Sequence, residues 1–176
     1  MKKNLLVFAV LAAVLMTSCG GGLKVEMDNP TGQSITVSID GDKEYTLAPM
    51  ELIEVKGLGK GEHTMQVAGG PELKFNLEGN SLLNPTLSIY VTDKTEYSSN
   101  SGDMDSSNWV TVIIDGEEYF GPIEVFENQP VIKLDKINYG VLTDFPEEVE
   151  TSRNSVVHTK LFRKNDFFKY YEEAYY

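Results

Sequence analysis

Two stretches of this chain alternate apolar and polar residues with a period of two and then reach an Asp-Gly pair. Residues 35–41 read Ile-Thr-Val-Ser-Ile-Asp-Gly, and residues 110–116 read Val-Thr-Val-Ile-Ile-Asp-Gly. A period of two places successive side chains on opposite faces of a strand. Asp-Gly favours a hairpin turn, because glycine adopts positive φ without a steric penalty. Each stretch therefore predicts a strand that feeds a tight β-hairpin.

The two stretches belong to an internal repeat. They lie 75 residues apart; after a one-residue deletion Tyr45 corresponds to Tyr119, and after a second Pro49 corresponds to Pro122. We interpret the repeat as two β-modules of the same ancestry. The alternative is chance similarity, since Val, Ile, Thr and Asp-Gly are the residues that any hairpin uses.

Short apolar segments separated by turn residues continue along the rest of the chain. Strands this short, without a long helical period, predict an all-β fold with two small antiparallel β-sandwich-like modules. Residues 98–108 have Met104 as their one apolar side chain and read as a linker or loop, which separates a module at 23–97 from a module at 109–164. The further strands that we expect are residues 23–27, 45–47, 52–55, 73–77, 86–91 and 123–126.

One position differs in character between the two copies of the repeat. Ser38 in the first copy corresponds to Ile113 in the second, so the second strand carries apolar residues on both faces. Strands of that kind are usually buried on both sides of their sheet. We expect residues 138–155, which have no counterpart in the first copy, to supply the additional cover.

The last twelve residues, 165–176, predict a short helix or tail. Phe167, Tyr171 and Tyr175 recur four residues apart and would share one helix face. Aromatic rings are enriched at protein interfaces, so the segment either packs on its own sandwich or docks on a partner. The tail residues that we consider as candidates for binding are Phe168, Tyr170, Tyr171, Tyr175 and Tyr176.

The beginning of the chain has the layout of a secretory signal peptide. Lys2 and Lys3 form a basic start, residues 5–16 are continuously apolar, and small residues then lead to Cys19, the only cysteine. Twelve apolar residues in a helix span about 18 Å, which is less than the roughly 30 Å of a bilayer core. The segment is therefore too short to be expected as a permanent membrane span.

This segment resembles the lipobox of bacterial lipoproteins, although Met16 stands where that family usually has leucine. The resemblance implies that residues 1–18 are removed, that Cys19 carries acyl chains such as palmitate, and that residues 19–22 form the lipid tether. It also implies a location in the bacterial cell envelope. Because Gly20 rather than aspartate follows the cysteine, we expect the outer membrane with the protein facing the periplasm, and the cell surface as the alternative.

The charge of the chain limits its partners. Without Lys2 and Lys3, 13 basic residues remain against 27 acidic ones, which gives a formal charge of −14. Such a surface repels nucleic acid phosphates and anionic lipid headgroups. We therefore expect no nucleic acid partner, and we expect the acyl chains rather than electrostatic attraction to hold the protein at the membrane.

No pattern in the sequence indicates an enzyme or a cofactor. His63 and His158 are the only histidines, and each precedes a threonine in an expected closing strand. A catalytic histidine needs a nucleophile or substrate group and a third group that orients the ring. The sequence marks neither, and Cys19 is expected to be lipidated. We predict a non-catalytic protein whose histidines lie at the edge of the core.

Two further groups of residues suggest weaker binding chemistry. Asp103, Asp105 and Asn108 place three oxygen ligands in a loop, which is a weak calcium candidate whose alternative is a solvated linker. Tyr119 and Phe120 precede a Gly-Pro bend that could present a ring to a sugar. Core packing is the competing explanation for both rings.

Residues 24–69 are similar to small bacterial envelope β-domains of the PEGA kind. The similarity rests on the Asp-Gly hairpin followed by a closing strand with Gly61, His63 and Met65, and it lacks the Pro-Glu-Gly-Ala motif. It implies a small β-domain with no catalytic residues. We predict a lipid-anchored, non-catalytic protein-binding or assembly subunit at the outer membrane, with a surface carbohydrate-binding accessory lipoprotein as the alternative.

Overall fold

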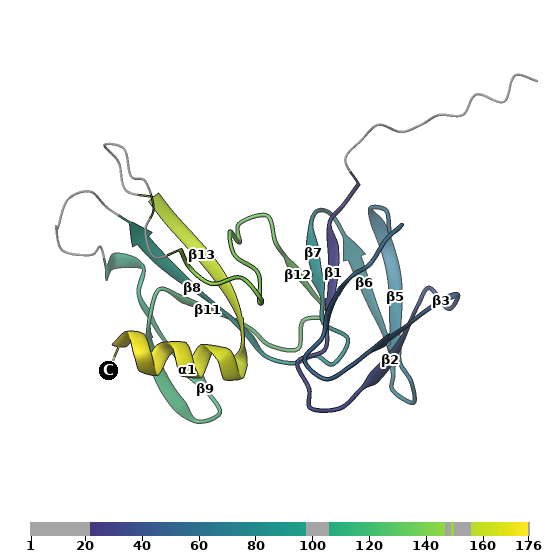
Figure 1. The fold of residues 1–176 in the computed structure, drawn as a ribbon, viewed down its shortest axis with the longest axis horizontal. Coiled ribbons are helices and arrows are strands. Elements are labelled where there is room, and N and C mark those ends of the chain that lie inside the picture. The colour runs from purple at the N-terminus through teal and green to yellow at the C-terminus, as the bar shows by residue number, and fades with distance from the viewer. Residues whose placement is uncertain (1–21, 98–105, 147–148, 150–155, 176) are drawn as a thin grey trace, which may run out of the picture.

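The computed structural model describes residues 22–97, 106–146, 149 and 156–175 (Figure 1). These residues form thirteen β-strands, a 3-10 turn (Ser106–Asn108) and one α-helix, α1 (Lys164–Tyr175), which confirms an all-β fold with a short C-terminal helix. The strands of the first half are β1 (Val25–Asp28), β2 (Ile35–Ile39), β3 (Lys43–Leu47), β4 (Leu52–Glu54), β5 (Gly61–Val67), β6 (Glu72–Leu77) and β7 (Ser81–Leu83). Those of the second half are β8 (Tyr90–Tyr97), β9 (Val110–Ile114), β10 (Glu117–Gly121), β11 (Ile123–Phe126), β12 (Val131–Lys133) and β13 (Val156–Arg163).

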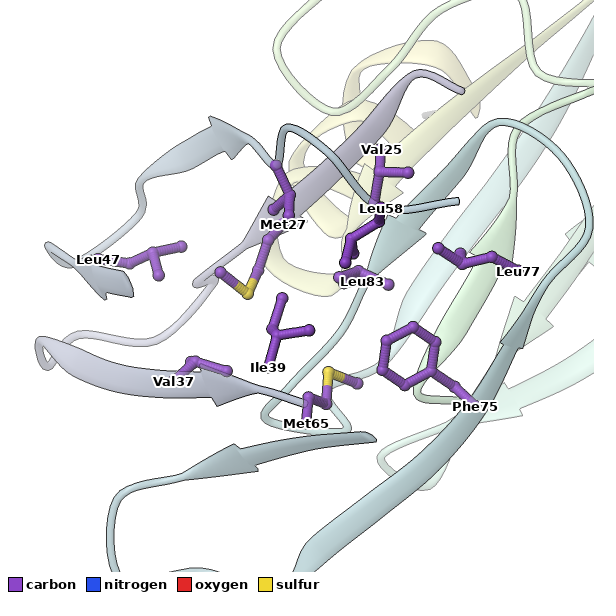
Figure 2. Packing of buried hydrophobic residues seen from close by; sticks show 11 residues of the cluster. Val25, Met27, Val37, Ile39, Leu47, Leu58, Met65, Phe75, Leu77 and Leu83 are labelled. Carbon is purple, nitrogen blue, oxygen red and sulfur yellow. The ribbon is translucent and has the colours of Figure 1, made fainter. Parts of the chain in front are cut away.

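The first sandwich consists of two four-stranded sheets. One sheet has the antiparallel order β3-β2-β5-β6. The other has the order β12-β7-β1-β4, in which β1 and β7 run parallel. Apolar side chains from both sheets fill the space between them, and each buried one stabilises the fold by about 1.5–3 kcal/mol (Figure 2). The residues at the centre of this core include Val25, Met27, Val37, Ile39, Leu47, Met65 and Leu83.

One strand of that sandwich comes from the other half of the chain. β12 pairs antiparallel with β7 and so completes the sheet that contains β1. Conversely, β8 lies between β11 and β13. The sequence placed residues 23–97 in one module and 109–164 in the other, but the sheets exchange one strand each across that boundary. Strand pairing is non-local, so the spacing of short strands along the chain did not reveal the exchange.

The second half is built on the antiparallel sheet β11-β8-β13. Helix α1 packs against β8 and β13 (Figure 1). The hairpin β9–β10 forms a separate two-stranded sheet, whose inner side chains join those of the helix in a second core. The buried residues of that core are Val91, Ile114, Tyr119, Ile123, Phe162, Phe167 and Tyr171.

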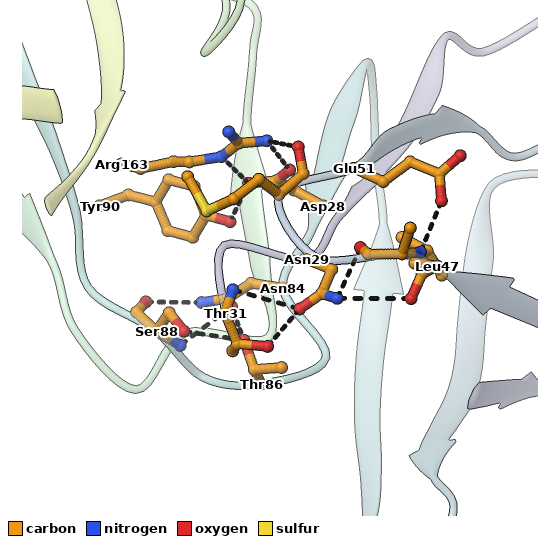
Figure 3. Close-up of polar contacts among 12 residues, drawn as sticks. Asp28, Asn29, Thr31, Leu47, Glu51, Asn84, Thr86, Ser88, Tyr90 and Arg163 are labelled. Carbon is orange, nitrogen blue, oxygen red and sulfur yellow. Dashed lines mark hydrogen bonds and ion pairs between the residues drawn. The ribbon is translucent and has the colours of Figure 1, made fainter. Parts of the chain in front are cut away.

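A third apolar cluster and a buried ion pair join the two halves. The cluster contains Leu82 from the first half and Leu161 from the second. Beside it, Arg163 donates from Nε and Nη2 to the two oxygens of Asp28 at 2.8 and 2.6 Å, and the Tyr90 hydroxyl donates to the same carboxylate at 2.6 Å (Figure 3). The hydrogen bond to Asp28 raises the pKa of Arg163, and burial raises the pKa of Tyr90. Loss of one partner would leave a buried charge uncompensated.

Matching Asn-Pro-Thr corners follow the parallel strands β1 and β7 (Figure 3). Each asparagine amide donates to a carbonyl four residues ahead, at 2.7 Å from Asn29 and 2.8 Å from Asn84. Each also holds the loop that leads into the neighbouring antiparallel strand, Asn29 through the Ala48 carbonyl at 2.8 Å and Asn84 through the Gln129 carbonyl at 3.0 Å. Two neighbouring strands of one sheet therefore end in the same corner geometry, which the sequence repeat at 35–41 and 110–116 does not include.

Both Asp-Gly pairs lie at hairpin tips, as the repeat predicts. The aspartates have φ of 52° and 54°, and the glycines that follow have φ of 73° and 88°. The two tyrosines of the repeat occupy the same place, because Tyr45 lies opposite Val37 and Tyr119 lies opposite Val112. The one-residue deletion falls in the turn, which has three residues between β2 and β3 and two between β9 and β10.

The prediction that β9 is covered on both faces is wrong. Ile113 is 68% exposed and Val110 is 45% exposed, although Ile114 is buried and Val112 is half-buried. The described part of residues 138–155 does not lie over β9. It runs beside β13 instead, where Tyr139 forms a bridge with Lys160. As a result, β9 carries an apolar side chain on a face that no element of the described chain covers.

Candidate interaction surface

The β9–β10 hairpin presents an apolar outer face. Ile113 and Thr111 alternate with the inward residues of β9 and lie opposite Glu118 and Phe120 of β10. Phe120 is 52% exposed, and the Trp109 ring, at the start of β9, packs against its edge at a centroid distance of 5.3 Å. We call Trp109, Thr111, Ile113, Glu118 and Phe120 the hairpin face.

The hairpin face borders an open strand edge. In a hairpin with a two-residue turn, the residues that flank the turn exchange backbone hydrogen bonds and the next pair does not. The backbone N–H and C=O groups of Thr111 and Ile113 therefore point away from β10. Within the described part of the chain, β10 is the only strand that pairs with β9. The opposite edge is closed, because the Tyr171 hydroxyl accepts from the Phe120 N–H and donates to the Phe120 carbonyl.

The inner side of the hairpin is held by aromatic packing. The Tyr119 ring stacks on Phe168 at 5.3 Å with an interplanar angle of 5°, and it meets Phe167 and Tyr171 edge-on. Burial and the neighbouring Glu117 raise the pKa of Tyr119 to about 12. At the tip, Lys164 Nζ lies 2.6 Å from Asp115 Oδ2. The exposed strand edge is therefore mounted on a firmly packed support.

The aromatic tail is part of the fold rather than a free contact surface. Phe168 packs on Tyr119, and Tyr170 stacks on Phe162 at 4.7 Å and donates from its hydroxyl to Asp93 at 2.8 Å. Tyr171 is 8% exposed. These rings complete the core of the second half, where they pack with side chains of β8, β13 and the β9–β10 hairpin.

Several predicted binding residues do not form an exposed group. Of the two proposed sugar-stacking rings, Tyr119 is 7% exposed, which leaves only Phe120 accessible. The side chains of Tyr175 and Tyr176 lie outside the described residues, and so do Asp103, Asp105 and the Asn108 side chain of the calcium candidate. Cys19 also lies outside them.

Both ring nitrogens of His63 lie within hydrogen-bond distance of an oxygen acceptor. Its Nδ1 lies 2.8 Å from Asp40 Oδ2, and its Nε2 lies 3.0 Å from the Gly59 carbonyl oxygen. A carboxylate and a carbonyl only accept hydrogen bonds, so this arrangement favours the doubly protonated ring. Burial of the ring opposes the charge, but the hydrogen bonds to Asp40 and Gly59 raise the pKa of His63. The His63 ring therefore links the β2–β3 turn to the loop before β5 through these two contacts.

The second histidine also has a packing role. His158 Nδ1 lies 2.9 Å from the Tyr139 hydroxyl, and its ring centroid is 5.2 Å from that of Tyr97. These contacts join β13 and β8 to the segment that follows β12. In the described ranges there is no group of three or more His, Cys, Asp or Glu side chains placed to hold a metal ion. The same ranges contain no helix long and apolar enough to cross a membrane.

Two features of the sequence pointed to the hairpin face: the Phe120 ring before a Gly-Pro bend, and an isoleucine at position 113 where the first copy has Ser38. We interpreted the extra apolar side chain as evidence for cover, whereas the structure leaves it exposed.

Comparisons of the chain with protein-family models, with curated proteins and with solved structures found no match.

Proposed function

We propose that this chain is a lipid-anchored, non-catalytic envelope protein that binds a protein partner by strand addition at β9. The observation that carries the proposal is the coincidence of an open strand edge at Thr111 and Ile113 with exposed apolar side chains beside it. An added strand would pair with the outward backbone groups of β9, and its side chains would cover the hairpin face.

The geometry favours a partner because an exposed apolar edge is normally avoided. Soluble proteins protect edge strands with charges, proline or covering loops, since open edges promote aggregation. In β9 the outward residues are threonine and isoleucine, and Glu118 across the pair is the only charge on the hairpin face. Burial of Ile113 and Phe120 against a partner would contribute about 1.5–3 kcal/mol each to binding.

The lipid tether rests on the sequence of the first 22 residues. Acyl chains on Cys19 would fix the protein at a membrane surface and raise the effective concentration of a partner in the same envelope. A binding subunit of this kind needs no catalytic group. The engagement of both ring nitrogens of His63 supports this part of the proposal.

The proposal is tested by site-specific cross-linking in living cells. A photo-reactive p-benzoylphenylalanine at position 113 should form a discrete adduct with one partner. The same amino acid at position 38, the equivalent place in the β2–β3 hairpin, should not. In the position-113 background, Thr111→Pro should abolish the adduct, because it removes the outward N–H of β9 without breaking a bond to β10.

Two controls make the cross-linking decisive. The melting temperature of Thr111→Pro should stay close to that of the parent, which shows that the hairpin still forms. Cys19→Ala, which lacks the acylation site, should lose metabolic fatty-acid label and give less adduct. Equal adducts at positions 113 and 38, or an adduct indifferent to Thr111→Pro, would overturn strand addition. Equal fatty-acid label in Cys19→Ala would overturn the tether.

A further inference from the structure

A cleft lies where the two halves of the molecule meet, away from the hairpin face. It has a volume of about 460 Å³. One wall is the face of the β11-β8-β13 sheet that is opposite to α1, and the other is the segment from Gln129 to Ile137, which contains β12. Ligand pockets in proteins typically enclose about 300–1,000 Å³. The cleft is therefore large enough for a small organic ligand.

Thr92 gives the cleft an unusual polar group. This residue is 2% exposed and lines the cleft from the central strand β8. Its hydroxyl oxygen is buried and has no hydrogen-bond partner among the described residues. Buried hydroxyls are normally paired, because an unpaired one costs stability. The oxygen has almost no accessible surface, so a ligand supplies the missing hydrogen bond only when the side chains that cover Thr92 shift as it enters.

The charged groups around Thr92 balance one another. Lys94 and Lys136 carry positive charges into the lining, and Glu124 and Asp135 carry negative ones. The third ammonium, that of Lys133, is neutralised by an ion pair with Glu78 outside the cleft. The site therefore has no net attraction for a strongly charged ligand, and the chain as a whole, at −12, repels anions. It offers hydrogen-bond donors and acceptors in similar number.

The remaining lining is apolar. Phe126, Val131 and Ile137 contribute hydrocarbon surface from both walls. A ligand that matches this lining has hydroxyl groups that both donate and accept, together with an apolar face. Sugars in the pyranose form have this combination, since their ring C–H groups form an apolar face and their hydroxyls project around its edge.

We infer that the cleft between the β11-β8-β13 sheet and the β12 segment binds a neutral pyranose sugar, with the Thr92 hydroxyl as a hydrogen-bonding group at its base. This inference goes beyond the proposed protein-binding function and uses none of the residues of the hairpin face. The sugar is either free or the end of a glycan chain, and both present the same ring chemistry.

The inference is tested by NMR titration of the full chain in detergent. The probes are D-glucose, D-galactose, D-mannose and N-acetyl-D-glucosamine, with sodium phosphate as an anion control. At least one sugar should shift the backbone amide signals of Thr92 and Thr159 in a saturable way, and phosphate should not. Tighter binding of the corresponding trisaccharide would indicate a glycan end, and equal affinity would indicate a free sugar. If only phosphate shifts these signals, or if none of the probes shifts them, the inference is overturned.

Two variants separate binding from folding. Thr92→Val removes only the hydroxyl, and it should weaken sugar binding about tenfold while the melting temperature stays equal or rises. Lys136→Met, at an exposed position, should also weaken binding, whereas Lys56→Met changes the charge equally outside the cleft and should not. If Thr92→Val binds as the wild type does, the Thr92 hydroxyl has no role in recognition; if it fails to fold, the Lys136→Met comparison decides. Equal binding by Lys136→Met and Lys56→Met would remove the cleft as the site.

Discussion

The two Asp-Gly hairpins have similar backbone angles at their tips and different surroundings. Both tips combine an aspartate with φ near 50° with a glycine at positive φ, and both place a tyrosine opposite a valine. In β2–β3 the strand β2 is central, with β3 on one side and β5 on the other. In β9–β10 the strand β9 lies at an edge. The same local sequence pattern therefore produces a core strand in one half and an exposed edge in the other.

Positions 38 and 113 differ in their surroundings because of this contrast. Ser38 lies on the outer face of a four-stranded sheet, next to Glu44 and Gln66 on the neighbouring strands. Its surroundings are polar, as is usual for the solvated face of an antiparallel sheet. Ile113 takes the equivalent place and is 68% exposed. The hairpin motif specifies how the chain reverses. It does not specify whether the outer face of the hairpin is polar, as at Ser38, or apolar, as at Ile113.

The tips also differ in the contacts that hold them. Asp40 accepts from the Thr64 N–H at 2.9 Å and pairs with His63, both of which lie on β5. Asp115 pairs with Lys164 at the start of α1. The first tip is thus held by an imidazole ring and the second by a lysine ammonium group. This contrast makes the two turns distinguishable by pH.

The largest expected effect is the difference in unfolding free energy between a truncation at the buried Ile39 and one at the exposed Ile113. Ile39→Ala removes a fully buried side chain from the first core and should lower the free energy of unfolding by about 2–5 kcal/mol. Ile113→Ala should change it by less than about 0.5 kcal/mol, because the side chain is already in solvent. Urea denaturation of both variants measures the two values. A large loss for Ile113→Ala would mean that the hairpin face is covered within the chain.

A second pair of variants compares the two Asn-Pro-Thr corners that follow β1 and β7. Asn29→Ala and Asn84→Ala each remove a fully buried amide that donates to backbone carbonyls, and each should cost about 1–3 kcal/mol of unfolding free energy. Equal losses would mean that both corners stabilise the fold to the same extent. A loss at only one corner, measured by the same denaturation experiment, would show that the corners are alike in geometry alone.

The smallest expected effect concerns the pH dependence of the two tips. The pKa of His63 is raised above its ordinary 6.5, so its ion pair stabilises the fold below pH 6.5 and is lost as pH rises through the higher folded-state value. The pKa of Asp40 is lowered from 3.8, so its share is present above that pH and is lost on acidification. Since Asp40 is partly exposed, the effect should stay below about 1 kcal/mol.

Thermal melts at pH 6 and pH 9 measure this contribution. Asp40→Asn should lose part of the stability difference that the wild type shows between these two pH values. Asp115→Asn should keep the wild-type difference, because it leaves the pair between His63 and Asp40 in place. If the stability of the two aspartate variants depends on pH in the same way, protonation of His63 is not coupled to folding.

The elements that the sequence predicted are those that a few adjacent residues determine. The Asp-Gly turns, the alternating strands at 35–39 and 110–114, and the C-terminal helix all result from backbone preferences and side-chain spacing within one element. The candidate site was only partly predictable. Phe120 was identified, but its neighbour Ile113 was expected to be covered, because spacing along the chain does not show which strands become edges.

The tertiary structure decided everything that depends on distant partners. β12 completes the first sandwich, Arg163 neutralises Asp28 from 135 positions away, and the cleft at Thr92 arises only where the halves meet. Turns and alternation are set by φ/ψ preferences of neighbouring residues, so the sequence by itself contains them. Burial and pairing are set by which surfaces exclude water together, and that is a property of the assembled sheets rather than of any single segment.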